Sequence, residues 1–161
     1  MTALHDSRRT FLVAAAGAIT SPAIVGGASA QSGMTMNDPS VVREIEAAFA
    51  GYDRALGAND VAALNGYFHD SPATVRYGIA ENLYGFAEIS AYRAGVAPPS
   101  GPPKRERTVI TTFGNDFATV ATLSRARAPG KIIRTMQSWV RFPYGWRIVA
   151  AHVSMIDNPG G

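Results

Sequence analysis

Apolar side chains recur at helical spacing in the first part of the chain and in strand-like runs in the second. Asp38 and Pro39 are typical of a helix start, and Gly57 is typical of a helix end. Two shorter helices are predicted next, one capped by Asn59 and one introduced by Gly85. The spacing of three and four residues in the first helix predicts one buried stripe, made of Val41, Val42, Ile45, Phe49, Tyr52 and Leu56.

Four long strands are predicted after a proline-rich loop at residues 97–103. Turn signals at Gly114-Asn115-Asp116 and at Pro143-Tyr144-Gly145 join residues 107–113 to 117–125 and residues 132–142 to 146–155. Such a sheet buries one face and needs helices to cover it. We therefore expect an α+β fold, a cone in which three N-terminal helices pack in a strongly curved, mostly antiparallel sheet with a pocket at its open end.

A shorter strand is predicted before the four long strands, and it contains an arginine. Alternation along residues 74–77 places Thr74 and Arg76 on one face and Val75 and Tyr77 on the other. If the first face points inward, the guanidinium needs an anion, since a lone buried cation costs several kcal/mol. A protein carboxylate (Glu81, Asp53 or Glu88) meets that need, and so does the carboxylate of a bound ligand.

The first thirty residues have the features of an export signal. Ser7-Arg8-Arg9-Thr10-Phe11-Leu12 is a twin-arginine pattern, an apolar run follows it, and Ala28-Ser29-Ala30 is a small-residue cleavage site. We expect cleavage after Ala30 and a periplasmic or otherwise exported product that is not held in a membrane. Residues 31–37 then form a flexible lead-in, residues 38–157 the domain, and residues 158–161 a tail.

Charge and composition exclude several classes of function. The formal net charge of the chain is only +3 and the basic residues are scattered along it, so we expect no nucleic-acid partner. The chain has no cysteine, which excludes disulfides and zinc-thiolate sites. We expect neither a metal nor a cofactor, because His69 and His152 show no metal-ligand spacing and no glycine-rich phosphate loop is present.

Several segments resemble the AtzH-like family, also called the HpxZ group, of the SnoaL-like branch of the nuclear transport factor 2 superfold. The resemblance is carried by residues 52–61, 75–78, 81–86, 111–114, 137–141 and 145–154, which include Val75-Arg76-Tyr77-Gly78 and Glu81-Asn82-Leu83-Tyr84-Gly85-Phe86. It implies the cone fold, a homodimer, and the decarboxylation or amide hydrolysis of a small carboxylated urea. The pocket tyrosine and arginine of the family correspond to Tyr52 and Arg76. The export signal is a departure from its cytoplasmic members.

These considerations define three candidate catalytic residues. Arg76 is expected to hold a carboxylate with its planar fork, or else to pair with a protein acid. Tyr52 is either a proton donor or an aromatic core residue with a satisfied hydroxyl. His152 shares a strand face with Ala150 and Ser154, and it is either a base or polar anchor in the pocket or a core histidine.

Further residues are candidates for substrate binding. Gln137 and Trp139 point the same way along their strand, either to the pocket floor or, for Trp139, to a dimer interface. Tyr84 belongs to residues 81–86, one of the segments that resemble the family. Arg134 is a cation that lies three residues before another such segment, residues 137–141. The chain is thus predicted to be a small exported enzyme acting on a carboxylated urea or amide. The alternative is a non-catalytic module that binds a small acid or a partner segment.

Overall fold

The computed structural model describes residues 34–97 and 101–158. The chain divides into two units, Met1–Ser32 and Gly33–Gly161, and all described residues belong to the second. The predicted export signal, its cleavage site at Ala30 and most of the tail lie outside the described residues. None of the described helices has the length and hydrophobicity needed to cross a bilayer.

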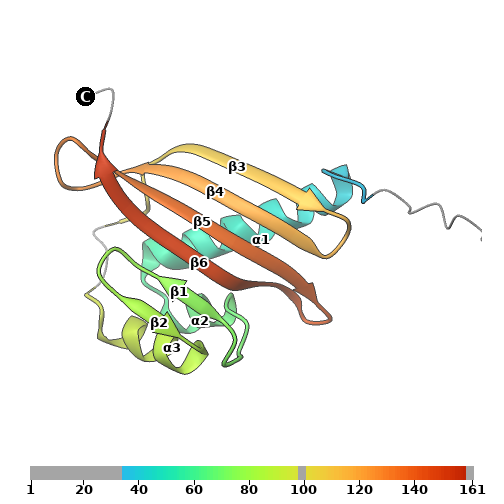
Figure 1. Ribbon diagram of the computed structural model, residues 1–161, viewed down its shortest axis with the longest axis horizontal. Helices are drawn as coiled ribbons and strands as arrows, with labels where there is room; N and C mark the ends of the chain where they lie inside the picture. Colours follow the sequence, from blue (N-terminus) through green and yellow to red (C-terminus); the bar gives the residue numbers. More distant parts are fainter. Residues whose placement is uncertain (1–33, 98–100, 159–161) are drawn as a thin grey trace, which may run out of the picture. The chain divides into compact units, whose positions relative to one another are not determined.

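Helices come first along the chain and long strands last, as predicted (Figure 1). The elements in order are α1 (Pro39–Ala58), α2 (Val61–Gly66), β1 (Val75–Tyr77), β2 (Asn82–Tyr84), α3 (Phe86–Gly95), β3 (Arg105–Phe113), β4 (Phe117–Arg125), β5 (Lys131–Phe142) and β6 (Gly145–Asp157). This is an α+β architecture, and it confirms the predicted fold class.

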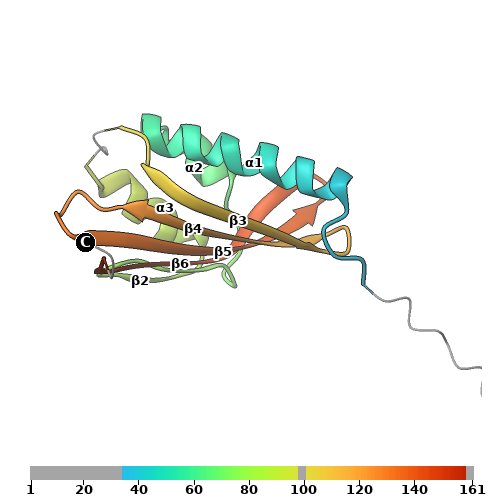
Figure 2. The same cartoon turned by 90° about the horizontal axis from the view of Figure 1, so that it is seen from above.

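The strands form one six-stranded open sheet in the order β2-β1-β6-β5-β4-β3. Every neighbouring pair is antiparallel except β1 and β6, which are parallel. Helix α1 lies along one side of this sheet (Figure 2). We call the side that α1 covers the inner face and the opposite side the outer face.

The stripe of α1 explains why the helix packs on the inner face. Asp38 caps it by accepting a hydrogen bond of 2.8 Å from the Ser40 N–H, and Pro39 occupies its first turn. Val41, Ile45 and Phe49 are buried, and they belong to one apolar core with Trp139 and Ile148 of the sheet. At about 1.5–3 kcal/mol for each large side chain removed from water, this stripe is what holds α1 in place.

The end of α1 differs from the prediction. Asn59 does not begin α2 but closes α1, with a left-handed backbone at φ 53°. The short polar side chain of asparagine tolerates this conformation, which ends helices. Asp60 caps α2 instead, accepting a hydrogen bond of 2.9 Å from the Ala63 N–H.

The described part of the lead-in pairs with β3 rather than lying free. The Asn37 N–H donates to the Thr112 carbonyl at 3.1 Å, and the Asn37 side chain accepts from the Thr112 N–H at 3.0 Å. Two residues earlier, the Thr35 carbonyl accepts from the Gly114 N–H at 2.8 Å. These bonds satisfy backbone groups at the outermost strand of the sheet.

Strand register assigns each side chain to a face. Arg76 aligns with Ala151, which aligns with Gln137, and Gln137 aligns with Val120. This row is on the inner face, since Gln137 and Val120 are buried under the helices. The next row points outward, because side chains alternate along a strand. It contains Tyr77, His152, Met136 and Ala121.

Candidate functional site

The inner face contains a cavity of about 780 Å³. Its walls come from helices α1 and α3, strands β1, β5 and β6, the start of β3, the end of β4 and the loops next to these two ends. Side chains that line it include Tyr52, Leu56, Arg76, Arg93, Arg105, Ser124, Ile133, Thr135 and Val153. A hollow of this size, lined by apolar groups and a few polar ones, is typical of small-molecule sites.

Tyr52 reaches this cavity from the buried stripe of α1. Its ring stacks on Phe49 at a centroid distance of 6.3 Å, and it meets Tyr67 and Trp139 edge to face at 6.0 Å and 6.1 Å. The side chain is 7% exposed and lines the cavity. Three rings thus fix the position of a tyrosine in the cavity wall.

Arg76 lines the same cavity from β1, and it pairs with Glu81 of the β1–β2 turn. Of the three acids considered for it, the structure selects this one. The pair is compact because the Gly78 N–H donates to the Glu81 carbonyl at 2.7 Å, which folds the turn back toward β1. The guanidinium also lies over the ring of Tyr92, 5.2 Å from its centroid. Arg76 therefore pairs with a protein carboxylate and also lines the cavity.

This pairing fixes the charge state of Glu81. Partial burial by itself raises the pKa of the Glu81 carboxyl, but hydrogen bonds from Arg76, the Ala80 N–H and the Tyr92 hydroxyl outweigh that effect. The pKa of Glu81 lies below its ordinary value of 4.5 as a result. Burial, and then the hydrogen bond to Glu81, raise the pKa of Tyr92. Near neutral pH, Arg76, Glu81 and Tyr92 are thus a cation, an anion and a neutral phenol.

Gln137 and Trp139 point to the inner face together, but they are not among the residues that line the cavity. Both are almost completely buried, and the Trp139 indole N–H donates to the Gln137 side-chain oxygen at 3.1 Å. They lie behind Tyr52, as its contact with the Trp139 ring shows. Their position is suited to holding the phenol rather than to touching a ligand.

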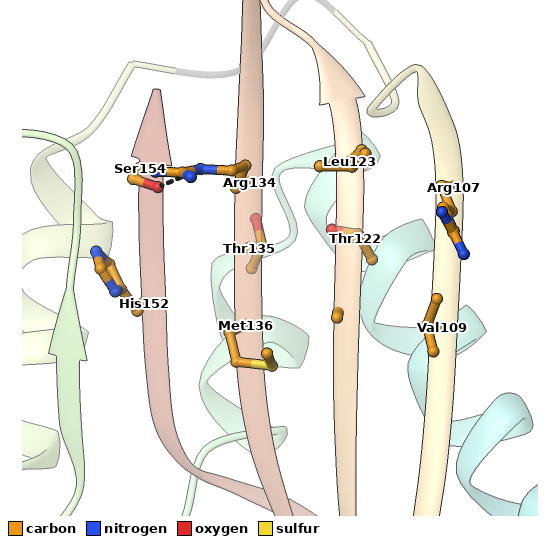
Figure 3. A pocket seen from close by; sticks show the side chains of 10 residues that line it. Arg107, Val109, Thr122, Leu123, Arg134, Thr135, Met136, His152 and Ser154 are labelled. Carbon is orange, nitrogen blue, oxygen red and sulfur yellow. Dashed lines mark hydrogen bonds between the residues drawn. The ribbon is translucent and has the colours of Figure 1, made fainter. Parts of the chain in front are cut away.

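His152, Arg134 and Tyr84 are not in this cavity. His152 and Arg134 line a separate hollow of about 430 Å³ on the outer face, where the Arg134 Nε donates to the Ser154 hydroxyl at 3.2 Å (Figure 3). Tyr84 is 57% exposed and aligns with Val75, which points to the outer face like Tyr77. The register turns the His152 face away from α1, so His152 lies outside this cavity, and because it is exposed it is not a core histidine either.

Two arginines of the cavity wall were not among the predicted site residues. Arg105 is half-buried, and its Nε and Nη2 donate to the two carboxylate oxygens of Asp53 at 3.0 Å and 2.5 Å. Arg93, in the last turn of α3, lies over the Phe68 ring at 4.9 Å. Arg93 stands near a segment that resembles the family, which is a weak signal, but its place in the cavity wall and that of Arg105 depend on how α3 and β3 are placed.

The donor set of the site is cationic and phenolic. No three histidine, aspartate or glutamate side chains within residues 34–97 and 101–158 are grouped so as to hold a metal ion. The described cavity lining contains arginine and lysine but no aspartate, glutamate or histidine. Such a wall attracts anions and positions a proton-carrying hydroxyl beside them.

Known proteins with this fold include close relatives. A cystatin-like fold protein from Burkholderia xenovorans LB400 is 49% identical, with a TM-score of 0.75 over 79% of this chain and 100% of that one. A protein of unknown function of the DUF3225 family, from Pectobacterium atrosepticum, is 44% identical, with a TM-score of 0.74 over 78% and 100%. A proposed dehydratase of the NTF2-like family from Streptomyces avermitilis is 16% identical, with a TM-score of 0.63 over 73% and 97%, and it shares the fold alone.

A search of curated proteins finds no match to this chain. The profile of the AtzH-like family matches residues 34–159, which include the whole helix-and-sheet unit and every residue of the cavity wall described above. The fold, the two close structural relatives and this match agree, and the chain belongs to the AtzH-like family.

Proposed function

We propose that this protein binds a small carboxylated urea or amide in the inner-face cavity and cleaves a C–N bond in it. Arg76 binds the carboxylate of the ligand, and Tyr52 gives a proton to the nitrogen that leaves. The proposal is carried by one observation, which is that Tyr52 of α1 and Arg76 of β1 line the same cavity. The membership of the chain in the AtzH-like family agrees with this substrate class.

The pairing of Arg76 with Glu81 leaves donors for a ligand. A guanidinium has five N–H donors, and the Glu81 contact involves its Nη1 atom. The remaining N–H groups can form the two-point contact that suits a carboxylate. Glu81 and the Tyr92 ring hold the guanidinium in place, so that less conformational freedom is lost when a ligand binds.

The chemistry needs one proton at the departing nitrogen. When the bond between nitrogen and a carboxyl carbon breaks, its electron pair goes to nitrogen, carbon dioxide leaves, and nitrogen takes the proton of the Tyr52 hydroxyl. Water then restores the proton to Tyr52. For amide hydrolysis, water adds to the carbonyl carbon before the same nitrogen departs. A positioned proton donor accelerates such steps by about 10²–10⁴-fold.

A binding function without catalysis is the second candidate, and one observation favours it. The described lining contains no aspartate, glutamate or histidine, so the cavity wall offers no conventional general base. The same arginines would then retain a small acid without changing it.

The test compares turnover with binding. Purified full-length protein is incubated with N-carboxylated ureas and ureido acids, alone and as Arg76→Met and Tyr52→Phe variants, and products are followed by mass spectrometry. We expect turnover by the wild type and a loss of about 100-fold or more in each variant. Equal turnover by all three proteins contradicts the roles of both residues. Thermal stabilisation by these acids without any turnover favours the binding function.

Two further predictions from the sequence complete the proposal. The twin-arginine pattern at Arg8 and Arg9 supports export, which cell fractionation of the wild type and of an Arg8→Lys/Arg9→Lys double variant tests. A homodimer is expected from the family resemblance, and sedimentation of the purified chain tests it. A cytoplasmic product or a monomer contradicts the respective prediction.

A further inference from the structure

Three arginines line the cavity from its more buried elements, and they differ in how their charge is balanced. Arg76 pairs with Glu81, and Arg105 pairs with Asp53. The guanidinium of Arg93 forms no ion pair or hydrogen bond with any residue in the described part of the chain, and its Nε is buried without a partner. A half-buried guanidinium in this state retains a desolvation cost that an anion would remove.

The surroundings of Arg93 hold it without using its donors. Its guanidinium carbon lies 4.9 Å from the centre of the Phe68 ring, and Phe68 is itself buried. A cation over an aromatic face is attracted to the ring, and this contact occupies none of the N–H groups that would bind a carboxylate. Arg93 also lines the cavity, so a ligand there would lie beside its side chain.

The other unpaired cations of the lining are in a different situation. Lys104 and Arg127 are exposed, so water already solvates their charges. Arg105 is further occupied by the hydroxyls of Thr122 and Ser124, at 2.8 Å and 3.0 Å. Among Arg76, Arg93 and Arg105, Arg93 should therefore contribute the most to the free energy of binding an anion.

We propose that Arg93 is the residue that makes the cavity selective for an anionic ligand, and that it binds the carboxylate of that ligand. The proposal rests on the function proposed above and deepens it. Arg76 has its charge matched by Glu81 and contributes mainly directed hydrogen bonds. Arg93 contributes the unmatched positive charge, so the difference in affinity between an acid and its neutral amide depends on Arg93.

A purely structural role for Arg93 makes a different prediction. The residue lies in the last turn of α3, where a cation stabilises the helix end, and it packs on Phe68. Loss of that role lowers the stability of the protein but changes the binding of acid and amide alike. The discrimination between the two ligands therefore separates a binding role from a structural one.

The experiment measures that discrimination by calorimetry on the full chain. The probes are N-carbamoylglycine and its amide, which has the same shape without the carboxylate. The variants are Arg93→Met and, as a charge-matched control, Arg43→Met, which removes an exposed cation from α1 outside the cavity lining. Arg93→Gln is the second variant to be used if Arg93→Met does not fold.

We expect the wild type and Arg43→Met to bind the acid at least 10-fold more tightly than the amide. In Arg93→Met or Arg93→Gln, affinity for the acid should fall by about 10–100-fold while affinity for the amide stays within about twofold. Retained discrimination in the Arg93 variants overturns this proposal and leaves the proposed function standing. A wild-type protein that does not prefer the acid overturns the anion-binding cavity itself.

Discussion

The two faces of the sheet carry neighbouring residues of the same strands, yet they differ in what surrounds them. Gln137 is 2% exposed on the inner face, whereas Met136, the residue before it, is 52% exposed on the outer face. Arg76 and Tyr77 differ in the same way, one in the cavity wall and one on an open surface. Helix α1 and the helices beside β1 cause this difference, because they cover one face only.

The comparison shows that residue type alone does not identify the site. Each face has a hollow with arginine in it, and the outer one even contains a histidine (Figure 3). Only the inner one combines arginines with a phenol fixed among aromatic rings. A fixed donor is what chemistry requires, since loosely held groups lose much of their effect. If the inner face holds the site, substitutions there should change stability and activity more than substitutions at neighbouring positions of the outer face.

The largest difference should appear when a buried side chain of the inner face is removed. Trp139 is fully buried and contacts both Tyr52 and Tyr67, so Trp139→Ala leaves a void and an unpaired Gln137 oxygen. We expect the free energy of unfolding to fall by about 3–5 kcal/mol, measured by urea denaturation. Ser138→Ala, one residue away on the outer face, should change it by less than about 0.5 kcal/mol. Similar losses in both would mean that the outer face is as tightly covered as the inner one.

A second test concerns activity and compares Tyr52 with His152. Tyr52→Phe keeps the aromatic packing but removes the proton donor, so turnover of the substrate should fall by about 100-fold or more with little loss of stability. His152→Ala, on the outer face, should leave turnover within about twofold of the wild type. Steady-state kinetics on both variants provide the measurement. A severe loss in His152→Ala alone would move the reaction to the opposite side of the sheet.

The sequence predicts well which side chains share one face of a helix or strand. It predicts poorly what packs against that face. The stripe of α1 correctly places Tyr52 on the buried side, and the alternation along residues 74–77 correctly places Arg76 on the same face as Thr74, because helical and strand periods are local properties. His152 does share a face with Ala150 and Ser154, but alternation alone does not say which face the helices cover, and here it is the opposite one. Arg93 could not be identified because its lack of an acid partner depends on where α3 packs.

Gly78 provides a third test, because it controls the partner of Arg76. A Cβ atom at Gly78 would lie 1.7 Å from the Glu81 Oε1 atom, so Gly78→Ala must displace the carboxylate that balances Arg76. We expect a loss of about 1 kcal/mol in the free energy of unfolding, since the displaced carboxylate is the end of a flexible side chain and the ion pair is partly exposed. A cation released from its partner should also bind small carboxylates more tightly, by calorimetry. Gly95→Ala is the matched control in α3, where a Cβ meets nothing within 4 Å, and it should be neutral or slightly stabilising.

The smallest expected effect is the acid sensitivity that Glu81 contributes. Its pKa in the folded protein is below 4.5, whereas in the unfolded chain it returns to about that value. The unfolded state therefore binds the proton first as the pH falls, and the stabilisation by Glu81, which is fully present above pH 4.5, is lost as the pH passes through the lower folded-state pKa. The contribution should be about 1 kcal/mol or less, since a partly exposed ion pair stabilises weakly. Wild type and Glu81→Gln should thus differ most in stability above pH 4.5 and converge as the pH falls below it. Glu46→Gln, at an exposed position on α1, should follow the wild type throughout. A gap that widens on acidification would mean that Glu81 is held protonated rather than as the anion that Arg76 requires.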